Sequence, residues 1–131
     1  MFVSAVLITG GSSTSRSAEI YNPLTNTSCS LPQLPEGRNF HSQDGGLTCG
    51  GGYPSTYTNC VKWSPASGTW NHSHTLKQRR SDHKSWATTS GVYLIGGYGG
   101  GKRTSEKVKD DGSVEEGFGL KYDTRLQSAI Y

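Results

Sequence analysis

A glycine-rich segment with the spacing of a phosphate-binding loop is the first candidate for chemistry in this sequence. Residues Gly96 to Lys102 match the pattern GxxxxGK and follow an apolar run. A phosphate-binding loop next requires Ser or Thr for magnesium, and then a helix whose N-terminus meets the phosphates. Here Arg103 follows, and no apolar helical periodicity appears after it. We therefore expect a glycine-rich hairpin loop between two strands, and no bound nucleotide.

A pair of histidines is the second candidate. His72 and His74, separated by one serine, would place both imidazoles on one face of a strand, which could form part of a metal site. No third ligand is evident nearby in the sequence. A solvated strand is the simpler interpretation, so we expect no metal site.

Two pairs of acidic residues flank a Gly-Ser turn, Asp110-Asp111 before it and Glu115-Glu116 after it. General acid–base catalysis needs carboxyl groups in distinct, shifted environments, whereas these look like solvent-facing charges. Lys107 or Lys109 could pair with them weakly. The sequence thus predicts no catalytic residue and no cofactor.

Three cysteines leave at least one thiol free or paired outside the chain. Cys49 and Cys60 flank a glycine-rich turn and could face each other across a hairpin, which makes them a candidate disulfide, whereas Cys29 lies elsewhere. Glycosylation sequons begin at Asn26 and Asn71, both in polar stretches. These features favour an extracellular setting only slightly over a cytoplasmic one, and they leave the compartment unknown.

The net charge of +3, from 13 basic and 10 acidic residues, is mild. Basic residues cluster only at 77–80 and 102–103, whereas a nucleic-acid binder would show a broader basic stripe with interleaved aromatics. No apolar run approaches the ~20 residues of a membrane helix. We therefore expect neither a nucleic-acid partner nor a membrane, and we interpret the basic clusters as solvated loops.

The elements that would position these residues are short strands. Only 31% of the 131 residues are hydrophobic and 18 are glycine, but the apolar residues form compact runs of β type. This composition predicts an all-β protein with many tight turns. Three apolar runs end in glycines, and each is followed by a polar loop. The runs are Ala5 to Gly11, Leu47 to Gly52 and Val92 to Gly97.

Landmarks after the glycines recur with the spacing of a structural repeat. Tyr21 and Trp63 are 42 positions apart, and further residues recur at the same offset. These are Leu34 and Leu76, Arg38 and Arg80, and His41 and His83. Equivalent residues in repeats are usually structural, so we expect the two histidines to form hydrogen bonds between neighbouring units.

This layout resembles the kelch motif, in which a strand ending in Gly-Gly is followed by a Tyr and then by a Trp some six residues later. The second copy matches with Gly50-Gly51, Trp63 in the Tyr place and Trp70. The first copy has Gly10-Gly11 and Tyr21, with Cys29 where the Trp is expected. The third has Gly96-Gly97, with Val108 and Val114 in the aromatic places.

The resemblance implies a β-propeller built of four-stranded antiparallel blades. At about 42 residues each, the chain would supply about three blades, with repeats at approximately 3–42, 43–86 and 87–131. Closed propellers have about four to eight blades, so we expect a ring that is not closed. The chain could be a fragment of a longer protein or a truncated gene product, or several chains could close a ring together.

The function that this resemblance implies is protein interaction without catalysis. Propellers resembling kelch act mostly through loops at one end of the channel, here the loops 12–17, 53–59 and 98–104 after the Gly-Gly strands. Tyr and Arg dominate interface hot spots. The expected partner-binding residues are Tyr53, Tyr57, Tyr98, Lys102 and Arg103.

Two alternatives remain open. The chain could be the scaffold of a kelch-propeller enzyme, similar to copper-radical oxidases or carbohydrate-active enzymes, with catalytic residues outside this chain. It could also belong to a ubiquitin-ligase substrate adaptor, which would need an oligomerisation domain that this chain does not contain.

Overall fold

Every regular element of the described structure is a β-strand. The structure, a computed structural model, describes residues 5–12, 15–52, 57–100 and 102–122. Within these residues no helix occurs, and all strand pairings are antiparallel. The all-β prediction is therefore confirmed. The described part of the chain also holds no helix that is long and apolar enough to cross a membrane.

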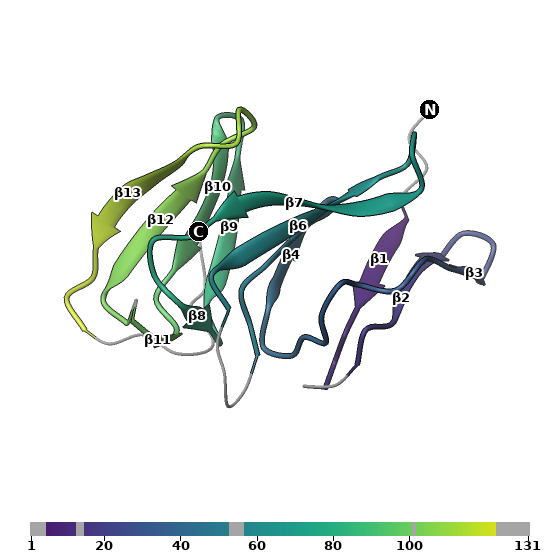
Figure 1. Ribbon diagram of the computed structural model, residues 1–131, viewed down its shortest axis with the longest axis horizontal. Helices are drawn as coiled ribbons and strands as arrows, with labels where there is room; N and C mark the ends of the chain where they lie inside the picture. The colour runs from purple at the N-terminus through teal and green to yellow at the C-terminus, as the bar shows by residue number, and fades with distance from the viewer. Residues whose placement is uncertain (1–4, 13–14, 53–56, 101, 123–131) are drawn as a thin grey trace.

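The first sheet has three strands in the order β1-β2-β3, drawn in purple and blue in Figure 1. They are β1 (Val6–Thr9), β2 (Ala18–Asn22) and β3 (Thr27–Ser30). Two asparagines shape the turn between β2 and β3. Asn22 Oδ1 accepts the Leu24 amide at 2.9 Å, and Asn26 adopts a positive φ of 54°, which asparagine tolerates better than most residues. Four strands were expected, whereas the described residues of this unit form three.

The second sheet is a four-stranded meander of β4 (Ser42–Asp44), β5 (Leu47–Cys49), β6 (Asn59–Ser64) and β7 (Thr69–Thr75). Trp63 and Trp70 are cross-strand partners with ring centroids 5.4 Å apart. Trp70 Nε1 also donates a hydrogen bond to the Pro32 carbonyl at 2.9 Å. The β6–β7 hairpin of the second sheet is thus tied to the segment that follows β3 of the first sheet.

The third sheet repeats this arrangement in the order β13-β12-β10-β9. Its strands are β9 (Lys84–Thr88), β10 (Gly91–Ile95), β12 (Thr104–Val108) and β13 (Val114–Gly119). Val108 and Val114 are cross-strand partners, at the place where the second sheet pairs its two tryptophans. On this sheet Tyr93 lies between Trp86 and Phe118, with ring centroids 5.4 and 5.7 Å away.

A two-stranded ladder joins the second unit to the third. Strand β8 (Arg80–Ser81) pairs with β11 (Tyr98–Gly99), so that Tyr98 lies opposite Ser81 and Gly99 opposite Arg80. The expected loop 98–104 therefore begins with a short strand and ends in β12. Sequence reasoning missed this pairing because two-residue strands carry no hydrophobic pattern.

The apolar core lies between the second and third sheets. The buried cluster consists of Leu47, Cys49, Cys60, Leu76, Leu94 and Val108, with Val92 and Val114 packed against it. Cys49 and Cys60 are direct partners across β5 and β6, and they form a disulfide. Cys29 is free and exposed. A fully buried aliphatic side chain contributes about 1.5–3 kcal/mol, so this cluster fixes the packing of the two sheets.

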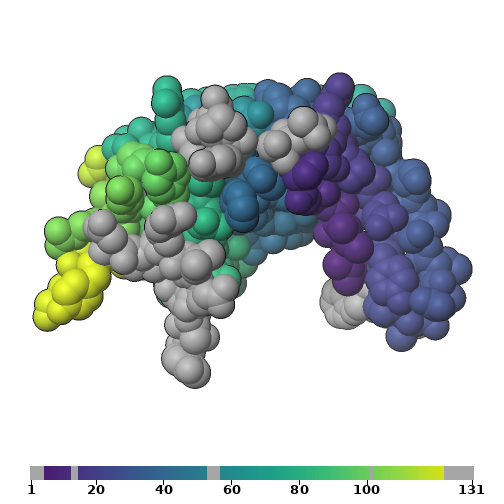
Figure 2. Space-filling view, turned by 90° about the horizontal axis from the view of Figure 1, so that it is seen from below, coloured from purple at the N-terminus to yellow at the C-terminus, as the bar shows by residue number. Residues whose placement is uncertain are grey.

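The three sheets stand side by side in chain order and spread like a fan, and the surface of the molecule is correspondingly arched (Figures 1 and 2). Strands β4 and β9, the first of their sheets, lie next to each other. None of the sheets closes on itself. The second sheet begins at Ser42 and the third at Lys84. The repeat boundaries expected from the sequence, 42/43 and 86/87, therefore fall inside β4 and β9.

Candidate functional site

The glycine pairs lie where consecutive sheets approach most closely. Gly50 has a φ of +63°, and a Cβ there would lie 2.5 Å from the Arg80 carbonyl oxygen. The next amide, that of Gly51, donates a hydrogen bond to the same carbonyl at 2.7 Å. Gly10 and Gly11 stand in the same relation to the Arg38 carbonyl. Only glycine fits this combination of positive φ and backbone contact.

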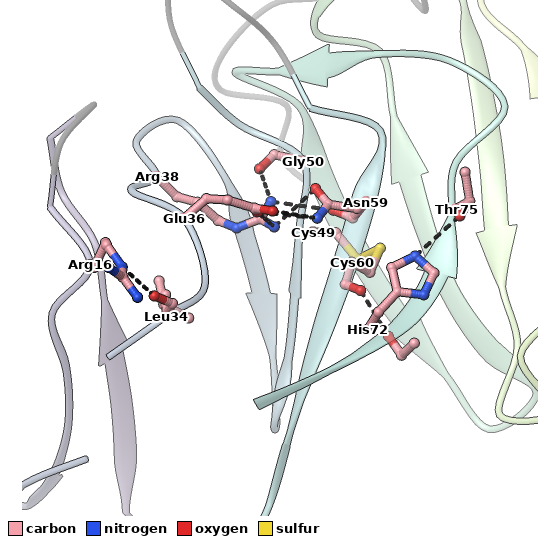
Figure 3. Close-up of polar contacts among 11 residues, drawn as sticks. Arg16, Leu34, Glu36, Arg38, Cys49, Gly50, Asn59, Cys60, His72 and Thr75 are labelled. Carbon is pink, nitrogen blue, oxygen red and sulfur yellow. Dashed lines mark hydrogen bonds and ion pairs between the residues drawn. A yellow bond between two sulfur atoms is a disulfide. The ribbon is translucent and has the colours of Figure 1, made fainter. Parts of the chain in front are cut away.

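The side chains of the same two arginines reach forward to the following sheet. Arg38 Nη1 donates to the carbonyls of Gly50 and Asn59 at 2.7 and 3.2 Å (Figure 3). Arg80 Nη1 donates to the carbonyls of Gly96 and Thr104, both at 2.9 Å. Each arginine thus holds one sheet through its carbonyl and the next through its guanidinium. This contact explains why an arginine recurs 42 positions apart.

The two recurring histidines also bridge the sheets. His41 Nε2 lies 2.9 Å from Thr9 Oγ1 of the first sheet, and His83 Nε2 lies 2.8 Å from Ser42 Oγ of the second. The expectation of hydrogen bonds between neighbouring units is confirmed for both. Burial, followed by the charge of Arg80, lowers the pKa of His83 to about 3. Burial also lowers the pKa of His41, so both rings are neutral near pH 7.

The β8–β11 ladder brings the two basic clusters of the sequence to one cleft. This cleft has a volume of about 580 Å³ and lies between the segment after β7 and the loop after β10. Three cations line it, Lys77, Arg79 and Lys102. Its remaining lining residues are Thr58, Gln78, Tyr98, Gly99 and Gly100. We call it the basic cleft.

The basic cleft is open to solvent, and its cations keep their charge unneutralised. Within the described residues no carboxylate forms an ion pair with Lys77, Arg79 or Lys102. Lys102 Nζ lies 5.6 Å from the ring centroid of Tyr98, whose exposed fraction is 40%. A cation over an aromatic face is a favourable pairing, and it positions one charge and one ring together at the mouth of the cleft.

The expected partner-binding residues divide into three groups. Tyr98 and Lys102 line the basic cleft. Tyr57 lies under the Arg38 guanidinium, 5.0 Å from ring centroid to carbon, and Arg103 Nη2 donates to the Lys121 carbonyl at 2.7 Å. Tyr53 lies outside the described residues.

Sequence reasoning missed Lys77, Gln78 and Arg79 as partners of the 98–102 loop. Both basic clusters are visible in the sequence, but they are more than 20 positions apart. Close approach is enforced at two glycines. A Cβ at Gly99 would lie 2.5 Å from the Arg79 carbonyl, and one at Gly100 would lie 2.5 Å from Gln78 Oε1. The run of glycines after β10 was the available signal.

The other candidates for chemistry have separate partners. The glycine-rich segment from Gly96 leads into strand β12 at Thr104, without a helix in its described residues, as a hairpin loop would. His72 Nε2 lies 3.1 Å from Thr75 Oγ1, whereas His74 Nε2 donates to the Lys109 carbonyl at 2.6 Å. Among the described residues no three His, Cys, Asp or Glu side chains gather as metal ligands would.

The two acidic pairs, 110–111 and 115–116, flank the Gly-Ser sequence in the turn between β12 and β13. One ion pair forms there, between Lys109 Nζ and Glu115 at 2.8 Å, as expected for a solvent-facing contact.

A comparison with models of known protein families finds no match. A comparison with curated protein sequences finds none either.

Proposed function

We propose that this chain is a segment of a kelch-type β-propeller and that it serves as a protein-interaction scaffold without catalysis of its own. One observation carries the proposal. The same junction of a glycine pair, an arginine and a histidine recurs between the first and second sheets and between the second and third. A recurring junction of this kind is expected where blades repeat around an axis.

In this proposal each sheet is one blade, and further blades complete the ring, either from the same polypeptide or from another chain. The two outer sheets support this step because each bears exposed apolar side chains. Val6 and Ile8 are 49% and 44% exposed on the first sheet, and Trp86 and Phe118 are 42% and 44% exposed on the third. Apolar groups gathered on an open sheet face mark surfaces that need a cover.

The partner binds, in this proposal, through the loops that follow the Gly-Gly strands. The rigid junctions beneath these loops support the assignment, since binding residues are disproportionately found on loops carried by a stable scaffold. Tyr57, Tyr98, Lys102 and Arg103 remain the proposed contact residues, together with Tyr53.

Site-specific photo-crosslinking tests this proposal. A photoreactive phenylalanine analogue is placed at Tyr57 or Tyr98 in the loops, and at Leu24 or Pro65 in exposed turns between strands as controls. The chain is then irradiated in an extract of its source, and captured proteins are identified by mass spectrometry. We expect one protein to be captured from both loop positions and from neither turn. Capture through the turns alone, or no capture, would overturn the proposal.

A further inference from the structure

The basic cleft carries an inference about the kind of partner. We propose that it binds a short acidic peptide segment, whose carboxylates meet Lys77, Arg79 and Lys102. This inference rests on the proposed function, because it names the chemistry of the segment that a scaffold of this kind would hold.

The cations of the basic cleft lie on a backbone that hydrogen bonds hold in place. Glu106 accepts hydrogen bonds from the amides of Lys77 and Gln78. The Gly100 amide donates to the Arg79 carbonyl at 3.2 Å. Both walls are therefore held before a ligand arrives, and preorganised charges lose little freedom on binding.

Glu106, the carboxylate that accepts the backbone amides of Lys77 and Gln78, does not neutralise these cations. Glu106 is buried, and its carboxylate accepts a hydrogen bond from Arg80 Nε at 2.7 Å. Its charge is thus compensated by an arginine that is itself fully buried. The charge that remains at the basic cleft is the positive charge of Lys77, Arg79 and Lys102, which favours an anionic ligand.

The distribution of charge over the molecule favours an acidic peptide over a nucleic acid. The turn between β12 and β13 contains Asp110 and Asp111, and Glu115 at the start of β13 pairs with Lys109. Basic charge is therefore local and is not a stripe along the molecule, whereas nucleic-acid surfaces need an extended one. Three cations and one exposed ring match a few carboxylates of an extended peptide.

Fluorescence anisotropy tests the inference with the whole 131-residue chain. The probe is a fluorescein-labelled octapeptide of alternating glutamate and serine, and the reference probe is the same peptide with lysine in place of glutamate. We expect saturable binding of the acidic probe alone, weakening steeply as salt is raised. Binding that ignores salt, or no saturable binding, would overturn the inference.

Charge reversal locates the site. The variant K77E/R79E/K102E should weaken binding of the acidic probe at least about tenfold. The matched variant K62E/K84E/K107E changes the net charge equally at three lysines that do not line the basic cleft, and it should keep the affinity within about twofold. Equal weakening by both variants would overturn the inference, since it would show attraction by net charge alone.

Two further measurements keep the inference falsifiable. The single substitution K102Q perturbs folding least, and it should still weaken binding about threefold while the melting temperature stays constant. A labelled octauridylate that binds more tightly than the acidic peptide would overturn the inference in favour of RNA. If the acidic peptide does not bind while the analogues at Tyr57 and Tyr98 still crosslink one protein, the inference of an acidic partner is overturned. The proposed scaffold function is then retained.

Discussion

The two arginine junctions occupy the same place in successive repeats, yet they find their counter-charges in different ways. Arg38 pairs with Glu36, two residues earlier in the chain, whose side chain is 40% exposed. Arg80 pairs with Glu106, 26 positions later in β12, whose side chain is 2% exposed. Both guanidinium groups are fully buried. The first pair is local and half-hydrated, whereas the second is buried and joins two units.

The difference extends to what each carboxylate holds. Glu36 also accepts hydrogen bonds from the Asn59 side-chain amide, at 3.1 and 3.3 Å (Figure 3). Glu106 instead accepts the backbone amides of Lys77 and Gln78. Both junctions therefore have the same guanidinium–carbonyl contacts, whereas their carboxylates differ in position along the chain. The second anion gains a further role, because it anchors one wall of the basic cleft.

The largest expected effect is the loss of the buried charge pair. R80M should lower the free energy of unfolding by about 4 kcal/mol, because it leaves the Glu106 carboxylate buried and unpaired. R38M should cost about 2 kcal/mol, since Glu36 can be hydrated and mainly the carbonyl contacts are lost. Urea denaturation of both variants measures the difference. Equal losses would contradict the comparison, and a larger loss in R38M would reverse it.

The two junctions also show how much of the structure can be predicted from the sequence. The all-β class follows from the short apolar runs. The 42-residue offset pointed to Arg38 and Arg80 as equivalent residues, and the structure gives them equivalent contacts. The counter-charges could not be predicted. Glu106 lies in the middle of a strand, and nothing in its local sequence shows that it faces Arg80.

The basic cleft could be predicted only in part. The sequence showed the basic clusters 77–80 and 102–103, but it gave no reason to bring them together. Their contact depends on β8 and β11, which are two residues each. Pairing of such short strands is determined by tertiary packing and by glycines at close approach, and not by a local pattern.

Gly10 and Gly50 allow a sharper test, because each contacts the arginine carbonyl oxygen, a feature that both junctions share. G10A and G50A should each cost about 2–3 kcal/mol. Both positions have a φ of +63°, and both would press a Cβ against an arginine carbonyl oxygen. G68A is the matched control. Gly68 has a φ of +66° but open space around it, so G68A should cost only about 1 kcal/mol.

Thermal or urea unfolding of the three glycine variants measures these costs. We expect G10A and G50A to agree with each other although R38M and R80M differ, since the carbonyl contact is common to both junctions. A loss in G50A no greater than that in G68A would show that the close approach contributes nothing.

The histidines allow the smallest effect to be measured as a function of pH. The folded pKa of His83, about 3, lies below its ordinary value of 6.5. The unfolded chain therefore binds more protons between these values, and stability must fall as pH drops through that window. From pH 7 to pH 5 the loss should be about 2 kcal/mol. Burial is the largest cause of the lowered pKa and the charge of Arg80 is the next, which links this titration to the second junction.

Substitution separates the two histidines. H83Q keeps a polar atom near Ser42 but cannot take up a proton, so it should flatten the fall in stability between pH 7 and pH 5. H41Q should flatten the fall less, because His41 is only partly buried, so its protonated ring stays closer to water. Urea denaturation at pH 7, 6 and 5 measures each slope. If stability falls with pH as steeply in H83Q as in the unmodified chain, the His83 ring is already hydrated in the folded protein. The second junction would then be no more closed to water than the first.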